Sequence, residues 1–344
     1  MEPIKVLIVE DSIVFRELLV QNLGKDPAIK IVATAKDPFE ARDLILEHHP
    51  NVMTLDVELP RMNGIDFLRK LIPQYPLPVV VISSLSDKVF DAMNAGAVDF
   101  VAKPTVSNRT QLEDFIKNEL LVKIKIASTA KISNIKKTVM MQQGSQQHLS
   151  NQRSNLIVAI GASTGGTEAI FSVVKDYATD IPGIVCVQHM PPGFTAMYAK
   201  RLNDQCRIQV KEAETGDRVL PGHMLLAPGG DRQMRLVKVG DSYQVEVKPG
   251  PRVNGHCPSV DVLFDSVAKV AGRDALGIIL TGMGGDGAKG LLNMRRAGAR
   301  TIGQDESTCV VYGMPKVAYD LGAVEYQEKL SDVAKRTYAL LNKM

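Results

Sequence analysis

The sequence of 344 residues has little of what marks several specialised classes of protein. Its 4 cysteines are widely spaced and form no Cys-x-x-Cys pair, so nothing indicates a disulfide framework or a zinc site. No apolar run is long enough to span a membrane and no secretory signal begins the sequence, so we expect a cytoplasmic protein without membrane insertion. A net charge of +3 and the lack of a basic helix-turn-helix module argue against a nucleic-acid partner.

Length and composition instead indicate a globular protein with two domains. A chain of 344 residues is too long for one ordinary core, and 45% hydrophobic with 23% charged residues is usual for a folded protein. Between residues 128 and 153 the apolar periodicity disappears and Lys, Ser, Asn and Gln predominate, as in a linker. We therefore expect a domain over residues 1–125, a linker over 126–153 and a second domain over 154–344.

The first domain contains short apolar segments separated by segments of helix length. We expect strands at residues 5–9, 29–33, 52–55, 79–82 and 100–102. These segments are too apolar for a half-exposed sheet, which predicts an α/β fold with a doubly wound, five-stranded parallel sheet covered by helices on both faces. In such a fold, ligands bind at the carboxyl ends of the strands.

Polar side chains follow these strands at their carboxyl ends. They are Glu10, Asp11, Asp56, Ser83 and Lys103. Each alone has an ordinary structural explanation, such as a helix cap or a turn. Together, the carboxylates would repel one another unless a cation compensates them, and Mg²⁺ prefers oxygen ligands. The group predicts a site where a carboxylate accepts a phosphoryl group while Mg²⁺ and the Lys103 ammonium stabilise its charge.

Three strings in this domain are similar to a known family. Val-Glu-Asp-Ser at 9–12, Leu-Asp-Val-Glu-Leu-Pro-Arg-Met-Asn-Gly at 55–64 and Lys103-Pro104 resemble the receiver domain of two-component response regulators. The resemblance implies phosphorylation by a partner histidine kinase, a bound Mg²⁺ and a conformational readout. The implied phosphorylation site is Asp56, the implied metal ligands are Glu10, Asp11 and Asp56, and the implied switch residues are Ser83, Phe100 and Lys103.

In the second domain, three expected strands each run into a turn with a reactive side chain. Residues 156–160 lead to Ser163 within Gly-Ala-Ser-Thr-Gly, residues 183–187 lead to His189, and residues 275–280 lead to Asp286. A serine on a strand-to-helix turn exposes its hydroxyl. These residues supply a triad in which Asp286 orients His189, His189 takes the Ser163 proton and Ser163 attacks an acyl carbon. Backbone amides around Met283, with Thr164, are candidate oxyanion donors.

Other interpretations of these segments stay open at the level of sequence. His223 and His256 compete with His189 as the base. Gly282, Gly284 and Gly287 also fit Gly-x-Gly-x-x-Gly, with Asp305 at the distance of a ribose-binding acid, as in a dinucleotide site. Against that site, the Asp286 carboxylate would repel a pyrophosphate. A third possibility is a scaffold without catalysis that uses phosphorylation to choose partners.

One further segment has a clear local pattern. Residues 233–239 and 243–248 alternate polar and apolar side chains around Gly240-Asp241. This pattern predicts a β-hairpin, which we expect to cover an edge of the sheet.

The motifs of the second domain are similar to those of the CheB family of chemotaxis protein-glutamate methylesterases. They are Gly-Ala-Ser-Thr-Gly-Gly-Thr at 161–167, Gln-His-Met-Pro-Pro at 188–192, Pro-Ser-Val-Asp-Val-Leu-Phe at 258–264 and Leu-Thr-Gly-Met-Gly-Gly-Asp-Gly at 280–287. The resemblance implies a Rossmann-like, mostly parallel α/β hydrolase domain. It also implies hydrolysis of glutamate methyl esters on the cytoplasmic helices of chemoreceptors and deamidation of receptor glutamines, with no cofactor. A chemotaxis-type histidine kinase is the implied phosphodonor, and phosphorylation is expected to relieve inhibition by the receiver.

Overall fold

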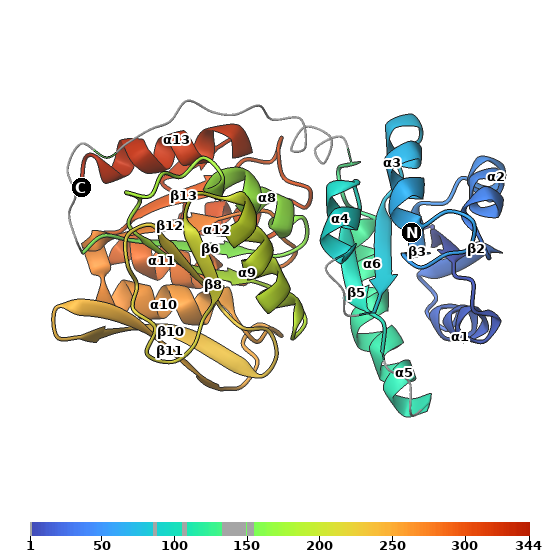
Figure 1. Cartoon of the computed structure of the whole chain (residues 1–344), viewed down its shortest axis with the longest axis horizontal. Coiled ribbons are helices and arrows are strands. Elements are labelled where there is room, and N and C mark those ends of the chain that lie inside the picture. The colour runs from blue at the N-terminus through green and yellow to red at the C-terminus, as the bar shows by residue number, and fades with distance from the viewer. Residues whose placement is uncertain (1, 85–87, 105–108, 133–148, 150–154) are drawn as a thin grey trace. The chain divides into compact units, whose positions relative to one another are not determined.

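The computed structural model describes residues 2–84, 88–104, 109–132, 149 and 155–344 (Figure 1). The chain divides into two compact units, Met1–Lys136 and Lys137–Met344, and each is described by itself. Most of the expected linker, residues 133–148 and 150–153, lies outside the described residues, as does residue 154. Within the described ranges, the helices are too short or too polar to cross a membrane.

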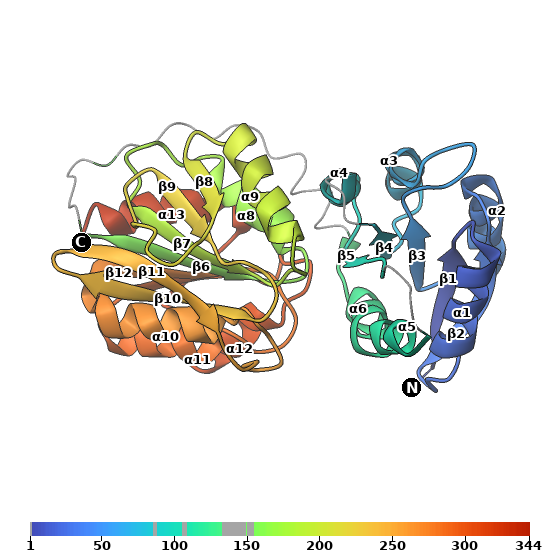
Figure 2. The same cartoon turned by 60° about the horizontal axis from the view of Figure 1, so that its bottom comes forward.

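The first unit is the predicted doubly wound sheet. Its strands are parallel and lie in the order β2-β1-β3-β4-β5. The strands are β1 (Ile4–Val9), β2 (Ile29–Ala35), β3 (Val52–Asp56), β4 (Val79–Ser83) and β5 (Asp99–Ala102). The helices are α1 (Ile13–Leu23), α2 (Pro38–His48), α3 (Gly64–Gln74), α4 (Lys88–Asn94), α5 (Arg109–Phe115) and α6 (Leu121–Ala127), with a π-helical turn at Ile116–Leu120 between the last two. Helices α2 to α4 cover one face and α1, α5 and α6 the other (Figure 2).

A close backbone approach shapes the loop that follows β3. The amide of Gly64 donates a hydrogen bond to the Val57 carbonyl at 2.9 Å, and a Cβ at position 64 would overlap with the Asp56 carbonyl oxygen. Asn63 then caps α3, because its side chain accepts from the amides of Ile65 and Asp66. The Asn-Gly pair therefore folds the loop back against the end of β3 and fixes the backbone at Asp56.

The second unit is built on a seven-stranded sheet in the order β14-β13-β12-β6-β7-β9-β8, with every neighbouring pair parallel. The strands are β6 (Ile157–Ala162), β7 (Gly183–Gln188), β8 (Gln209–Glu212), β9 (His223–Leu226), β12 (Ala275–Ile279), β13 (Arg300–Gln304) and β14 (Tyr326–Glu328). The helices are α8 (Gly166–Val174), α9 (Phe194–Gln205), α10 (Val260–Val270), α11 (Ala288–Arg296), α12 (Met314–Asp320) and α13 (Leu330–Leu341), with a 3₁₀ turn at Gly272–Asp274. Helices α8, α9 and α13 cover one face, and α10 to α12 cover the other (Figure 2).

The predicted hairpin is present, but it does not cover a sheet edge as expected. Strands β10 (Arg232–Val239) and β11 (Ser242–Pro249) pair antiparallel in a two-stranded sheet of their own. Alternate apolar side chains of the hairpin belong to the same core cluster as the apolar face of α10. The Leu236 amide also donates to Ser266 Oγ of α10 at 2.9 Å. The hairpin therefore packs on α10, because that helix offers the apolar surface its inner face needs.

Candidate active site and phosphorylation site

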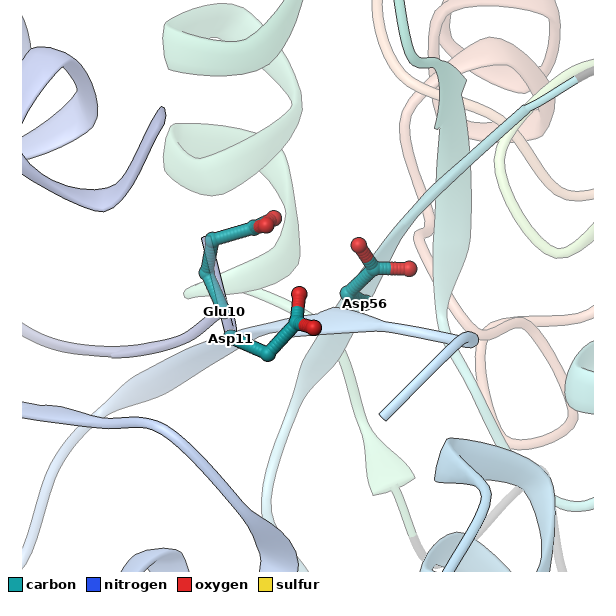
Figure 3. Close-up of side chains that lie close together, drawn as sticks. All are labelled: Glu10, Asp11 and Asp56. Carbon is teal, nitrogen blue, oxygen red and sulfur yellow. The ribbon is translucent and has the colours of Figure 1, made fainter. Parts of the chain in front are cut away.

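In the first unit, the structure brings together the carboxylates expected to hold a metal. Glu10 and Asp11 follow β1 and Asp56 ends β3, and one oxygen from each lies within 4.8 Å of the others (Figure 3). Glu10 and Asp56 are buried, whereas Asp11 is exposed. Three converging carboxylates with one open side fit a hard divalent cation such as Mg²⁺, which takes oxygen ligands and keeps several waters.

Lys103 balances part of this negative charge. Its Nζ lies 3.0 Å from each Glu10 carboxylate oxygen and 2.5 Å from Asp56 Oδ2. Burial raises the pKa of Glu10 to about 7, repulsion from Asp56 adds to the rise, and Lys103 opposes it. One ammonium is thus not enough to stabilise three neighbouring carboxylates, and the site gains from a further positive charge.

The expected switch residues lie on β4, on β5 and directly after β5, on the side of β3 away from β1. Ser83 is buried at the end of β4, and its carbonyl accepts from the Lys103 amide at 2.6 Å. Phe100 on β5 is buried and packs edge-to-face on Phe90 of α4, with ring centroids 6.2 Å apart. Ser83 and Lys103 are therefore joined through the backbone, while the Phe100 ring contacts a helix that covers the sheet.

We expect Mg²⁺ to stabilise the receiver through these carboxylates. At a concentration about 100-fold above its Kd, the ion should add about 2.7 kcal/mol to the free energy of unfolding. Asp11→Asn should remove most of this gain, since it deletes a ligand charge, whereas Asp43→Asn, an exposed aspartate on α2, should retain it. Calorimetry with and without Mg²⁺ measures the gain, and an equal gain in both variants would contradict a metal site at Asp11.

In the second unit, the turns after β6, β7 and β12 are neighbours because β6 lies between the other two strands. The His189 amide donates to the Ala162 carbonyl at 3.1 Å, and the Ser163 amide donates to the Thr281 carbonyl at 3.0 Å. Gly282 allows close packing here, since a Cβ at this position would lie 2.8 Å from Ser163 Cβ. The turn that carries Ser163 is therefore fixed on both sides.

His189 and Asp286 form a hydrogen bond at the same edge of the sheet. His189 Nε2 lies 2.8 Å from Asp286 Oδ2, and both side chains are buried. The other ring nitrogen, Nδ1, is buried and has no hydrogen-bond partner within the described part of the chain. Within the described part of the chain, no hydrogen bond joins Ser163 Oγ to His189. Catalytic hydrogen bonds of this kind often form only when substrate is bound. With Asp286 on Nε2, the nitrogen left to accept a proton is Nδ1.

Asp286 is held more extensively than the sequence indicated. Its carboxylate accepts bonds on both oxygens, from His189 and from a segment that precedes and begins α10. The donors in that segment are Asn254 Nδ2 at 2.8 Å, Ser259 Oγ at 2.7 Å, and the amides of Val260 at 2.7 Å and Asp261 at 3.2 Å. Burial alone would raise the pKa of Asp286, but the bonds from His189, Asn254 and Ser259 outweigh it and hold this pKa well below its usual range. Asp286 is therefore ionised at neutral pH.

Sequence reasoning did not find Asn254 or Ser259 as parts of this site. The sequence feature that could have pointed to Ser259 is its position as a helix N-cap. Its hydroxyl accepts a hydrogen bond from the Val262 amide at the start of α10. A helix N-terminus stabilises a nearby anion, and here that anion is the side chain of Asp286. The segment at 258–264 thus holds the acid of the site.

The candidate oxyanion donors differ in their surroundings. Met283 has a side chain that is 45% exposed, and among the described residues its backbone amide donates to no protein atom. Thr164 is buried, and its carbonyl accepts from Thr281 Oγ1 at 3.0 Å. Because Met283 follows Gly282, which packs closely on Ser163, its unbonded amide lies near that serine.

The competing interpretations fare differently in the structure. His223 begins β9, so it lies at the amino end of a parallel strand, away from the edge that carries His189. His256, in contrast, stacks on the His189 ring. Asp305 accepts from Ser307 Oγ at 2.5 Å and from the Thr308 amide at 3.1 Å, as a local turn residue does. Because Asp286 binds His189 and Asp305 binds its own turn, the geometry favours the triad over a dinucleotide site.

Two family models match the chain. A response regulator receiver domain matches residues 6–117, and CheB methylesterase matches residues 158–337. The crystal structure of the Thermotoga maritima CheB methylesterase catalytic domain is 36% identical, with a TM-score of 0.53, and its whole length aligns with 55% of this chain. Fold and matches together define a receiver domain joined to a parallel α/β hydrolase domain.

Two relatives align with nearly the whole of this chain. A relative in Syntrophomonas wolfei, named protein-glutamate methylesterase/protein-glutamine glutaminase 2, is 58% identical over 99% of this chain and 98% of its own length. Another in Syntrophotalea carbinolica, named protein-glutamate methylesterase/protein-glutamine glutaminase, is 50% identical over 98% of each chain. The chain belongs to the CheB methylesterase family, as its motifs predicted.

Proposed function

We propose that this protein is a phosphorylation-controlled hydrolase of chemotaxis adaptation. It removes methyl esters from glutamates on the cytoplasmic helices of chemoreceptors and deamidates receptor glutamines. Its relatives are named for methylesterase activity on protein glutamate and glutaminase activity on protein glutamine. The observation that carries the proposal is the 2.8 Å bond between His189 Nε2 and Asp286, beside the turn of Ser163. The proposed domains are the receiver at 1–125, a linker at 126–153 and the catalytic domain at 154–344.

In the first step, Ser163 attacks the acyl carbon of the ester or amide. Asp286 keeps the proton of neutral His189 on Nε2, so the lone pair on Nδ1 takes the proton of the Ser163 hydroxyl. The carbonyl oxygen becomes an oxyanion, which the amide of Met283, with Thr164, stabilises. The negative charge of Asp286 in turn stabilises the imidazolium that forms on His189.

In the second step, the proton on His189 Nδ1 moves to the leaving group. Methoxide leaves as methanol from an ester, and the amide nitrogen leaves as ammonia, with the acyl group on Ser163 Oγ. Water then gives a proton to Nδ1 as its oxygen attacks the acyl carbon. The bond between that carbon and Ser163 Oγ breaks and Nδ1 returns the proton to Oγ, which restores the serine and leaves a glutamate. The amide depends more on this proton because its nitrogen is the poorer leaving group. The chain's own side chains supply every proton transfer, so the scheme uses no cofactor.

Methanol release from methylated receptor cytoplasmic fragments tests the hydrolase directly. We expect release by the wild type and a loss of about 10³-fold or more in Ser163→Ala, since the nucleophile is gone. Ser307→Ala, an exposed serine of the same domain, should retain the wild-type rate. Failure of the wild type to release methanol under any condition would instead favour a scaffold that binds partners without turnover.

We also propose that the receiver controls this hydrolase. A histidine kinase of the chemotaxis type transfers a phosphoryl group to Asp56 with Mg²⁺ held by Glu10, Asp11 and Asp56. Lys103 Nζ, 2.5 Å from Asp56 Oδ2, is placed to bind the new phosphoryl oxygens. Ser83 would donate its hydroxyl to the phosphate, and the readout passes to Phe100. Phosphorylation then shifts the protein towards the state in which the catalytic domain is active.

The full-length protein with acetyl phosphate and Mg²⁺ tests this control. We expect the initial rate of methanol release to rise by about 5- to 150-fold, the usual range of allosteric coupling. Asp56→Asn should abolish the rise because no acyl phosphate forms, whereas Asp66→Asn, an exposed aspartate on α3, should keep it. A rise that survives in Asp56→Asn would contradict control through Asp56.

A further inference from the structure

The face of the His189 ring is covered by a second histidine. The His256 and His189 rings are stacked, with centroids 3.7 Å apart and planes only 10° from parallel. The bond to Asp286 fixes Nε2 of His189 but leaves the ring able to turn about that contact. A stacked ring removes this freedom, because turning His189 would drive its edge into His256. The plane of His189, and with it the direction of the Nδ1 lone pair, is therefore set by both partners.

We propose that His256 is a positioning residue, which holds the plane of His189 by stacking and so directs Nδ1 towards the Ser163 hydroxyl. The inference rests on the proposed function, in which His189 is the base. In a parallel stack, the nitrogens of His256 lie in a separate plane from those of His189, so no in-plane hydrogen bond joins the two rings. Towards His189, His256 therefore presents the face of its ring.

The loop around His256 is held in one conformation. Val253 and His256 exchange two backbone hydrogen bonds of 2.9 Å, and Arg252 Nη1 donates to the Gly255 carbonyl at 3.1 Å. Between them, Asn254 takes up a left-handed conformation with φ of +53°. Its side chain bridges two carboxylates, donating to Asp286 at 2.8 Å and to Asp261 at 2.7 Å. One short loop thus contacts both Asp286 and His189.

A buried glutamine anchors this loop to the hairpin. Gln233 on β10 is fully buried, and its Nε2 donates to the Pro251 carbonyl at 2.9 Å and to the His256 carbonyl at 3.4 Å. Its Oε1 accepts from the Ser259 amide at 2.8 Å. The hairpin that packs on α10 therefore also supports the loop that carries His256. This gives the hairpin a role in the site that its sequence did not indicate.

Two substitutions of similar size separate stacking from nitrogen chemistry. His256→Phe keeps a flat ring and loses both nitrogens, while His256→Gln keeps polar atoms and loses the ring. We expect His256→Gln to lower kcat for methyl ester hydrolysis by about 10- to 100-fold, with KM within about twofold, because a misdirected base costs rate and not binding. His256→Phe should stay within about threefold of the wild type. His223→Ala, a histidine at the far end of the sheet, serves as the matched control and should leave kcat unchanged.

The opposite order, with His256→Gln active and His256→Phe impaired, would overturn the proposal and assign the role to the His256 nitrogens. Wild-type rates in both variants would overturn it as well.

A second readout does not depend on turnover. Carbon-13 NMR relaxation of the His189 ring C–H groups in full-length protein should show a rigid ring in the wild type and in His256→Phe, and a more mobile ring in His256→Gln. This result would support the positioning of the ring even if the wild type released no methanol. If the wild type is active but the His189 ring gives the same NMR result in His256→Gln, the positioning role of His256 is refuted. The proposed hydrolase function would still stand.

Discussion

The catalytic unit is organised around one buried anion, the carboxylate of Asp286. A buried charge is costly unless hydrogen bonds replace its hydration, and Asp286 receives them on both oxygens. Each of these bonds ties the loop after β12 to another part of the domain: His189 to β7, and Ser259 to the start of α10. Satisfying this charge therefore brings separate segments together, and it fixes the tautomer of His189 as a consequence.

The receiver also places carboxylates at the carboxyl edge of its own parallel sheet, but it leaves their charge partly uncompensated. Its carboxylates also lie at strand ends, but among the described residues Lys103 is the one cation that pairs with them, and the pKa of Glu10 rises to about 7. A cluster that lacks positive charge is suited to gain it from outside, through a metal ion. Asp286 is satisfied by the protein and stays ionised, whereas Asp56 lies in a group that gains from a ligand. The two sites thus differ in how much of their charge the chain itself neutralises.

The sequence predicted the parts of the fold that depend on local patterns. Strands β1 to β7 and β12 were predicted from their apolar residues, whereas β8, β9, β13 and β14 were not predicted. Strand β8 is half exposed and β13 begins with Arg300. The hairpin was found from its alternation, but its packing on α10 depends on tertiary contacts that no local pattern records.

The same limit applies to the candidate site. Ser163, His189 and Asp286 were chosen because each follows an expected strand, and the structure places them at neighbouring turns. Asn254, His256 and Ser259 follow no strand end of the parallel sheet. They reach the site because α10 and the hairpin fold over it, across separations in sequence of 25 residues or more from Asp286. Their contacts therefore appear only in three dimensions.

The most direct test of this account is the kinetics of Asp286→Asn. An amide at this position would offer an N–H to His189 Nε2, which then has to accept and leaves the proton on Nδ1, where it blocks transfer from Ser163. The account predicts that kcat for methyl ester hydrolysis falls by about 10⁴-fold while the variant stays folded. A variant that keeps kcat within about tenfold of the wild type would contradict the role of Asp286 as the anion that orients His189.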